Sequence, residues 1–576
     1  MKVSDVFVHS RAIWRRVSQV MFVLFCLGLS ALAMTASFDS RTRYILAATA
    51  VLFGVTILLL WEIRIMRQYG LSIFPPGSGT FRTHKDQRVG RFLSLIELIS
   101  RFRWSSGGIL VGRPLPQHRL FGLFRGLRVG PVDDRHMLTV AGARSGKGTA
   151  ALIPNLLLYP GSALVVDPKG ELAQITAARR GQGSQQVSRS LKQSVYILDP
   201  EDIVVGHTKA RWNPLAELEM SDPHLWGKAA RIGLALVPIR SEKGGDEFFT
   251  NQARDLLTAL IVHVLTTEPS ERHNLIYVRR LITQGDMEVF TMVEEECDQS
   301  GTELPLSDPL QAMLSYMKTN TVQAGKVSRV AQSILALADE TKAGVIGTLV
   351  EQTGFLDHYS METLLQSSDF TLADLKTRPT TVYICLKGTS LAGPLAKIVF
   401  LLIDLAITRM EEIPGKPPHN VLFAIDEFYC LGRSEAIDRA MGLIAGFGLT
   451  LWPVLQHIGQ LQKHYPDTWD NFIRNCRAVQ YFGDLAPDLL RELESRLGQR
   501  VVRKKGGTDE YVPLLPFTEL SSNYFTRESR RQLVFFQQQP AAALELVDHY
   551  KLFSKEMYED DPRAKDRSQY VAWTTP

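Results

Sequence analysis

One stretch of the sequence, HMLTVAGARSGKGTAALIPNLLLYPGSALVVDPKGEL at residues 136–172, constrains the fold more than any other. Its apolar run at 137–140 predicts a strand, and a glycine-rich turn and a helix beginning at Gly146 follow. A second apolar run at Ala163–Val166 predicts another strand. This order of strand, turn, helix and strand predicts an α/β fold.

The turn has the composition of a phosphate-binding loop. Small residues let successive backbone N–H groups point inward, and the dipole of the following helix adds positive potential. A lysine then reaches the β- and γ-phosphates of a nucleotide, and Lys147 stands in that position. The predicted nucleotide-binding residues are Gly142, Ala143, Arg144, Ser145, Gly146, Lys147, Gly148 and Thr149.

Two positions of this loop depart from the pattern G-x-x-x-x-G-K-[ST]. Ala141 stands where the first glycine would be, with Gly142 next to it. Gly148 replaces the hydroxyl residue that would bind magnesium. Thr149, one place further on, is therefore the predicted hydroxyl ligand of Mg²⁺.

A pair of acids after a later apolar run supplies the second half of such a site. The run Val421–Ile425 predicts a buried strand, and Asp426 and Glu427 follow it. A metal-bound nucleotide needs one carboxylate to hold Mg²⁺ and another to activate water. We assign the metal to Asp426 and the water to Glu427, and expect ATP and Mg²⁺ as cofactors. The alternative is a strand end whose acids cap the next turn.

Two further strand ends carry polar side chains that we expect near the nucleotide. The run Leu449–Leu455 ends in Gln456, which is suited to sensing a γ-phosphate or is a simple strand-end amide. Asp167, Lys169 and Glu171 follow the second strand and either line the site or form a turn with a local ion pair.

Near the start of the chain, residues 20–37 and 44–61 carry no charge. Each run is close to the ~20 residues that a helix needs to cross a bilayer. Only FDSRTR separates them, so we predict a transmembrane hairpin. Lys and Arg flank its outer ends, which places both termini in the cytoplasm. A cleaved signal peptide would leave the second run unexplained, and a buried hairpin would not need apolarity on every side.

Residues 82–128 are rich in Lys and Arg, with Asp86 and Glu97 as the acids and aromatic residues interleaved. The stretch suits attraction to anionic headgroups of the inner leaflet or a surface that faces nucleic acid. The net charge of the whole chain, +5, is too small to identify a partner.

The five cysteines and thirteen histidines form no metal-binding pattern. No C-x-x-C, H-x-H or H-E-x-x-H is present, which argues against a disulfide framework, a zinc site and a metallohydrolase.

Residues 222–356 have little strand pattern, and their apolar residues recur at helical spacing. Strand pattern resumes at 380–386. An all-α block is therefore expected to interrupt the sheet. One predicted helix face contains Phe249, Ala253, Leu256, Leu257, Leu260 and Val264.

The motifs taken together resemble the coupling proteins of type IV secretion and conjugation, the TraG-like group. The resemblance covers most of residues 107–500, with its motifs in family order. These motifs are S-G-K-G-T, I-P-N-L-L, V-V-D-P-K-G-E-L, W-N-P-L, F-F-T-N-Q-A-R-D-L-L, T-V-Y-I-C and D-E-F-Y-C-L-G, followed by matches at 444–483.

The resemblance implies a RecA-like P-loop ATPase with an inserted all-α domain, assembled as a hexamer at the bacterial inner membrane. Such a protein passes single-stranded DNA, a relaxase–DNA complex or protein effectors to other components of a secretion channel. The expected domains are a transmembrane hairpin (1–70), a basic juxtamembrane linker (71–106), a nucleotide-binding domain in two parts (107–220 and 371–550), an all-α domain (221–370) and a tail (551–576).

Some features depart from the group or leave alternatives open. The predicted extracytoplasmic loop is short, and the sequence after Gly498 matches poorly. Arg474 and Arg477 are candidates for the arginine that ring ATPases supply from a neighbouring subunit. A substrate-receptor platform without a motor role, and a DNA translocase of the chromosome-segregation type, are the alternative functions.

Overall fold

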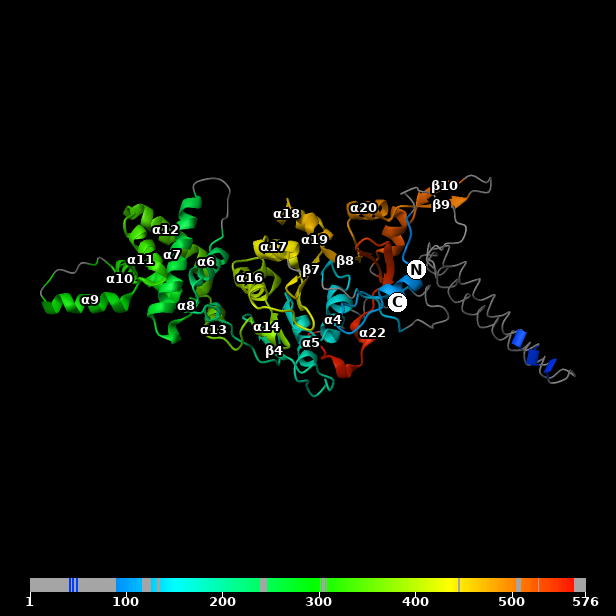
Figure 1. The fold of residues 1–576 in the computed structure, drawn as a ribbon, viewed down its shortest axis with the longest axis horizontal. Helices are drawn as coiled ribbons and strands as arrows, with labels where there is room; N and C mark the ends of the chain where they lie inside the picture. Colours follow the sequence, from blue (N-terminus) through cyan, green and yellow to red (C-terminus); the bar gives the residue numbers. More distant parts are fainter. Residues whose placement is uncertain are drawn as a thin grey trace. The chain divides into compact units, whose positions relative to one another are not determined.

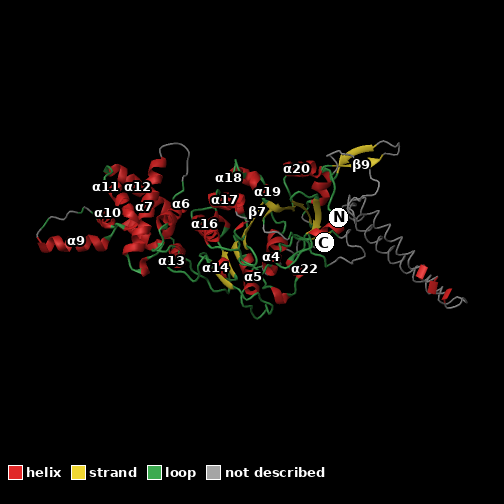
Figure 2. Cartoon of the chain, viewed as in Figure 1, coloured by secondary structure: helices red, strands yellow, loops and turns green. Residues whose placement is uncertain are grey.

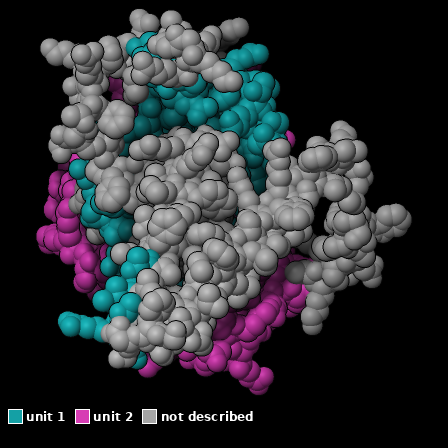
Figure 3. All heavy atoms as spheres, turned by 90° about the vertical axis from the view of Figure 1, so that its right-hand side faces the viewer, with its two compact units in different colours: residues 1–104, 111–131, 487–546 teal, residues 105–110, 132–486, 547–576 magenta. Residues whose placement is uncertain are grey.

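The computed structural model describes residues 41–42, 44–45, 48–49, 90–115, 126–131, 135–238, 246–300, 302, 306, 308–443, 446–503, 509–526 and 528–563. Its contacts divide the chain into two compact units, coloured separately in Figure 3. Unit 1 consists of residues 1–104, 111–131 and 487–546, and unit 2 of residues 105–110, 132–486 and 547–576.

Unit 2 is built on a parallel sheet (Figure 1). Most of its strands are buried along their whole length, which explains why they read in the sequence as continuous apolar runs rather than as alternating ones. In spatial order the strands are β8 (Cys476–Phe482), β2 (His136–Ala141), β7 (Leu449–Leu455), β6 (Val421–Ile425), β3 (Ala163–Val166), β5 (Thr380–Ile384) and β4 (Ser194–Leu198).

The four sequence-predicted strands of the site region are confirmed, three of them residue for residue and the first within one residue at either end. Helices connect the strands of this sheet, as Figure 2 shows by colour. The helix predicted from Gly146 begins instead at Lys147, as a π-helical turn, because Gly146 takes a left-handed conformation. The connecting helices are η3 (Lys147–Leu152), α4 (Ile153–Leu158), α5 (Glu171–Arg180), α16 (Ala396–Glu412), α17 (Glu435–Leu443), α18 (Gly459–His464) and α19 (Trp469–Arg474).

Between β4 and β5 the described residues form helices and no strand. The predicted apolar face of α7 is buried at all its positions except Phe249, which is partly exposed. The helices of this helical segment are α6 (Leu225–Leu236), α7 (Asp246–Thr267), α8 (Leu275–Gln284), α9 (Met287–Ser300), α10 (Pro309–Thr319), α11 (Val322–Leu335), α12 (Asp339–Thr353) and α13 (Tyr359–Leu365).

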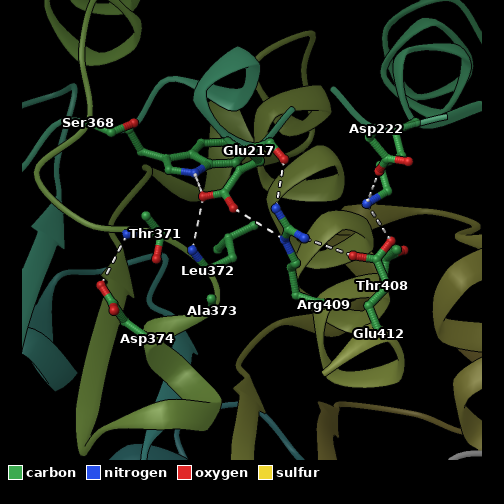
Figure 4. A network of polar contacts seen from close by, with 12 residues as sticks. Glu217, Asp222, Ser368, Thr371, Leu372, Ala373, Asp374, Thr408, Arg409 and Glu412 are labelled. Carbon is green, nitrogen blue, oxygen red and sulfur yellow. Dashed lines mark hydrogen bonds and ion pairs between the residues drawn. The ribbon is translucent and has the colours of Figure 1, made fainter. Parts of the chain in front are cut away.

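One buried carboxylate contacts both the segment that leads from the sheet into the helical segment and the segment that returns from it (Figure 4). Glu217, in η4 (Pro214–Glu217), accepts hydrogen bonds from the Trp212 indole at 3.3 Å and from the Leu372 backbone N–H at 2.9 Å. Arg409 of α16 approaches the same carboxylate at 3.7 Å and donates to the Glu217 carbonyl at 2.8 Å. The segment before the helices, at Trp212, the segment after them, at Leu372, and α16 therefore meet at the Glu217 side chain.

Arg180, at the end of α5, is fully buried without an acidic partner among the groups it contacts. A guanidinium has five N–H donors. They donate to five described acceptors, which are Thr381 Oγ1 and Gln193 Oε1, and the backbone carbonyls of Leu156, Tyr159 and Gly161. This cluster joins the end of α4 to α5 and to β5.

Unit 1 contains an antiparallel sheet and a separate hairpin. Phe102 in its core stacks on Phe536 with ring centroids 4.0 Å apart, and Phe92 bridges to Ala541. Both phenylalanines lie in the basic stretch, residues 82–128, and are buried. They are therefore core residues and cannot stack on nucleic acid at the surface. The elements are α3 (Leu95–Arg101), β1 (Arg113–Pro114), α20 (Pro487–Leu497), β9 (Gln499–Arg503), β10 (Asp509–Pro513), β11 (Arg531–Phe536) and β12 (Ala541–Glu545).

None of the helices in the described part of the chain is long and apolar enough to span a bilayer. The first predicted span, 20–37, lies outside the described residues. The second, 44–61, is described only at residues 44–45 and 48–49.

Candidate nucleotide site

The predicted site residues meet at one edge of the unit 2 sheet. Because its strands are parallel, their carboxyl ends lie at the same edge, which is where α/β sheets bind ligands. The P-loop follows β2, Gln456 follows β7, Asp426 follows β6 and Asp167 follows β3. These strands are consecutive neighbours in the sheet.

The P-loop conformation depends on Gly142 rather than on Ala141, which is the last residue of β2. A Cβ at position 142 would lie 2.0 Å from the backbone oxygen of Asp484, so that only glycine fits. Gly146 has φ +92°, in the left-handed region that favours glycine. Ser145 closes the loop by donating from its hydroxyl to the Gly142 carbonyl at 2.6 Å.

The lysine, the presumed water-activating carboxylate and the strand-end amide lie in contact. Lys147 Nζ is 3.5 Å from Glu427 Oε1, and Gln456 Nε2 donates to Glu427 Oε2 at 2.8 Å. Strand β7 lies between β2 and β6, so Gln456, which follows β7, lies between Lys147 and Glu427. Glu427 has φ +50°, a conformation uncommon for a residue with a side chain, and strained residues of this kind cluster at active sites.

Two carboxylates are buried beside this group. Burial, and then the negative charge of Glu427, raises the pKa of Asp426 to about 6, although Lys147 and Lys169 oppose the shift. Burial raises the pKa of Asp167 to about 7, and the charge of Asp426 adds to it. The Asp167 carboxylate accepts from the backbone N–H groups of Ala173 at 2.9 Å and Lys169 at 3.3 Å, which partly offset the burial.

These residues fit a magnesium–nucleotide complex. Mg²⁺ is usually held by one or two carboxylates together with waters and phosphate oxygens, and not by a cage of protein ligands. Asp426 is in position to hold the ion, and Lys147 to hold phosphate.

Thr149 makes a contact that the sequence did not predict. Its hydroxyl donates to Asp548 Oδ1 at 2.9 Å, and its carbonyl lies 3.3 Å from His549 Nδ1. Position 148 is different, since a Cβ built there would meet no heavy atom within 4 Å in the described part of the chain, its own helix backbone and chain neighbours apart. The role of Thr149 as a magnesium ligand stays a prediction.

The two candidate trans-acting arginines differ in where they lie. Arg474, at the end of α19, pairs with Asp470 at 3.0 Å and its side chain is largely exposed. Arg477 lies in β8. Whether either reaches a neighbouring subunit stays a prediction.

Two residues remote in sequence contact the P-loop and were not predicted from the sequence. Gly483 has φ +75°, and a Cβ there would lie 2.2 Å from Ser145 Cβ. Gly483 directly follows β8, whose strand was not predicted, and a glycine at the end of such an apolar run is a usable signal for a tight turn. Asp548 had no such signal, because it is remote in sequence and belongs to no motif.

Comparison with known proteins gives the family of the chain. The model of the family described as "Type IV secretory system Conjugative DNA transfer" matches residues 107–538. The type IV secretion system-coupling protein VirD4 of Bartonella quintana (strain Toulouse) is 26% identical over 380 residues, 64% of this chain and 54% of that protein. The conjugal transfer protein TraG of Escherichia coli is 23% identical over 381 residues, 64% of this chain and 56% of that protein. The chain thus spans about half the length of the curated relatives it matches.

Solved structures agree on the fold. The plasmid coupling protein TrwB in complex with ADP and Mg²⁺ aligns with a TM-score of 0.53 at 17% identity, over 82% of this chain and 97% of that one. A trigonal form of TrwB lacking its N-terminal segment, in complex with sulphate, aligns with a TM-score of 0.56 at 17% identity and the same coverage. The chain has this RecA-type α/β fold and belongs to the type IV secretory system conjugative DNA transfer family.

Proposed function

We propose that this chain is a coupling ATPase that brings DNA, as a relaxase–DNA complex, or protein substrates to a type IV secretion channel and drives their transfer. The observation that carries the proposal is the meeting of Lys147, Glu427 and Gln456 at the sheet edge beside buried Asp426. ATP and Mg²⁺ are the proposed cofactors.

Each residue has a role that its position permits. The Lys147 ammonium binds β- and γ-phosphate oxygens and leaves its pairing with Glu427 when the nucleotide enters. Glu427 then accepts a proton from, or orients, the attacking water. Gln456, which holds Glu427 through its amide, positions that carboxylate and senses the γ-phosphate. Bound Mg²⁺ would offset the charge that develops on the phosphates.

The comparisons support this proposal without extending to the whole protein. The matched relatives are named for coupling and conjugal transfer, and TrwB is known in complex with ADP and Mg²⁺. By analogy we propose single-stranded DNA, relaxase or effector proteins and other channel components as partners, with a homo-hexamer as the working form. Measuring ATP turnover with and without single-stranded DNA tests the DNA cargo, since we expect DNA to increase the rate.

We also propose that residues 20–37 and 44–61 anchor the chain in the inner membrane with both termini in the cytoplasm. The uncharged runs and the Lys and Arg at their outer ends support this topology. Protease protection in inverted vesicles tests it, since digestion of the nucleotide site from the cytoplasmic face is expected. Protection of that site would contradict the topology.

Lys147→Ala tests the ATPase directly. Loss of the phosphate-binding ammonium should reduce ATP turnover by at least ~10³-fold, because the charge of the transferring phosphoryl group is no longer stabilised. Turnover is measured on the full chain in detergent, with circular dichroism to check the fold. Lys318→Ala is the matched control and should keep wild-type turnover, since Lys318 is an exposed lysine of α10 outside the nucleotide site. Full activity of Lys147→Ala would refute the proposal.

A receptor platform is the second candidate, and the absence of a hydroxyl at Gly148 favours it. Glu427→Gln separates the two functions, because the amide keeps the shape of the side chain but cannot take a proton. We expect nucleotide binding to persist and turnover and substrate transfer to fall by ~10²–10⁴-fold. Transfer that survives this substitution would favour the platform.

A further inference from the structure

We propose that this site binds Mg²⁺ without a hydroxyl ligand from the P-loop, and that Thr149 instead anchors the C-terminal segment (residues 547–563) through Asp548. The inference rests on the proposed nucleotide site and assigns its metal ligands more narrowly. Asp426 is then the protein ligand of the ion, and a water occupies the place of the missing hydroxyl.

The first observation is the space at Gly148. In the pattern G-K-[ST] the residue after the lysine carries the hydroxyl that binds magnesium. Here that residue is glycine, and apart from its own helix backbone and chain neighbours no heavy atom of the described residues lies within 4 Å of where its Cβ would be. The glycine is thus not required by a close approach of the backbone. The space accommodates a side chain, or a water that completes the shell of the ion.

The second observation is the engagement of Thr149. Its hydroxyl hydrogen is donated to Asp548, whose side chain is almost fully buried. Successive residues of a helix point roughly a quarter of a turn apart. A side chain at position 149 therefore cannot take the direction of one at position 148 while it also reaches Asp548. A buried carboxylate needs its hydrogen bonds, which gives Thr149 a structural reason to remain there.

The third observation is the path of the C-terminal segment. Its helix α22 (His549–Leu552) packs against α4, directly after the P-loop. Further along, the Glu559 backbone N–H donates to the Ile175 carbonyl at 3.1 Å. Arg563 donates to the Lys169 carbonyl at 2.7 Å. The segment thus runs from the P-loop helix to the turn after β3, and the Thr149–Asp548 hydrogen bond holds its first part.

The test measures metal binding apart from turnover. Full-length protein is loaded with Mn²⁺·ADP, and the water ligands of Mn²⁺ are counted by electron spin-echo spectroscopy in D₂O. In parallel, the Mg²⁺ concentration at half-maximal binding of a fluorescent ADP is measured. Gly148→Ser should remove one water from the Mn²⁺ shell and lower the half-maximal Mg²⁺ concentration ~3–10-fold, because it supplies the missing hydroxyl.

Thr149→Val should leave the water count unchanged and the half-maximal Mg²⁺ concentration within about 2-fold of wild type. It should also increase proteolytic cleavage within residues 547–563, because the hydrogen bond to Asp548 is lost. Asp548→Asn is the second variant, with the same expected pattern. In Thr149→Val, one additional water ligand on Mn²⁺ or a tenfold higher half-maximal Mg²⁺ concentration would overturn the inference. Wild-type protein that binds no nucleotide would overturn the proposed function, and this inference with it.

Discussion

Two buried charged groups of unit 2 lie close together in the chain but differ in how their charge is stabilised. Arg180 is fully buried and donates all five of its N–H groups to acceptors. Asp167 is equally buried, but burial raises its pKa and the charge of Asp426 adds to the rise. Burial, and then the charge of Glu427, likewise raises the pKa of Asp426.

The difference distinguishes a structural charge from a functional one. The Arg180 cluster is complete within the chain and needs no ligand. The Asp167–Asp426 pair is incomplete, because two like charges share a site of low polarity and a cation would relieve both. Buried groups that are strained in this way are typical of active sites.

The largest effect is expected at the complete cluster. Arg180→Ala removes a hydrogen-bond donor from each of five buried acceptors, of which Gln193 Oε1 and the Gly161 carbonyl keep another donor. It should lower the free energy of unfolding by ~3–5 kcal/mol. Urea unfolding measures the change. Arg179→Ala is the matched control, because the adjacent Arg179 is only half buried, and should cost about 1 kcal/mol. If the alanine variant does not fold, Arg180→Lys should still be less stable than wild type. Equal stability of Arg180→Ala and Arg179→Ala would contradict the comparison.

A smaller effect, opposite in sign, is expected at the incomplete pair. The folded-state pKa of Asp167, about 7, lies above the usual value of 3.8. Between those pH values the folded state binds more protons than the unfolded state, so stability falls as the pH rises from about 4 to about 7. Asp167→Asn removes this loss and should stabilise the nucleotide-free protein by ~1–3 kcal/mol at pH 7.

Thermal unfolding of Asp167→Asn and wild type across pH 4–8 measures that difference. The two curves should approach each other towards pH 4, where Asp167 is protonated in the folded state and close to half protonated in the unfolded state. Asp255→Asn is a control in the helical segment, where partial desolvation raises the pKa of a carboxyl on an exposed residue. A gap between wild type and Asp167→Asn that grows as the pH falls would contradict the assignment.

The smallest effect is expected at Glu217, which resembles the Arg180 cluster in having partners for its polar atoms. Burial raises the pKa of Glu217, and the Leu372 N–H and Trp212 indole are the first groups to oppose the shift. Glu217→Gln keeps an acceptor for these donors and should lower stability by less than about 1 kcal/mol. Glu217→Ala should cost ~2–3 kcal/mol, because buried donors lose their acceptor. Equal losses in the two variants would show that the negative charge matters more than the hydrogen bonds.

Much of the sheet and of the site was predictable because the signals are local. A strand buried on both faces is a continuous apolar run, so β6 and β7 were predicted to the residue. Parallel strands end at one edge, so Lys147, Glu427 and Gln456 were expected in the same site, and the structure places them in contact.

The remaining features depend on residues far apart in the chain. Gly142 rather than Ala141 is the required glycine because the backbone at Asp484 approaches it, some 340 residues later in the sequence. Phe102 reads as part of a basic and aromatic surface, yet it packs on Phe536 in the core of unit 1. No local pattern distinguishes a buried aromatic residue from an exposed one when its partner lies in another part of the chain.

The sequence by itself determined the kind of fold and the chemistry of the site, because hydrophobic periodicity and short polar motifs act over a few residues. Only the tertiary structure showed which acceptor the Thr149 hydroxyl contacts. Thr149 was the nearest available hydroxyl in the sequence, but the return of the C-terminal segment brings Asp548 to it. A hydrogen bond forms with whichever acceptor packing brings within about 3 Å, and that proximity is a property of the whole fold.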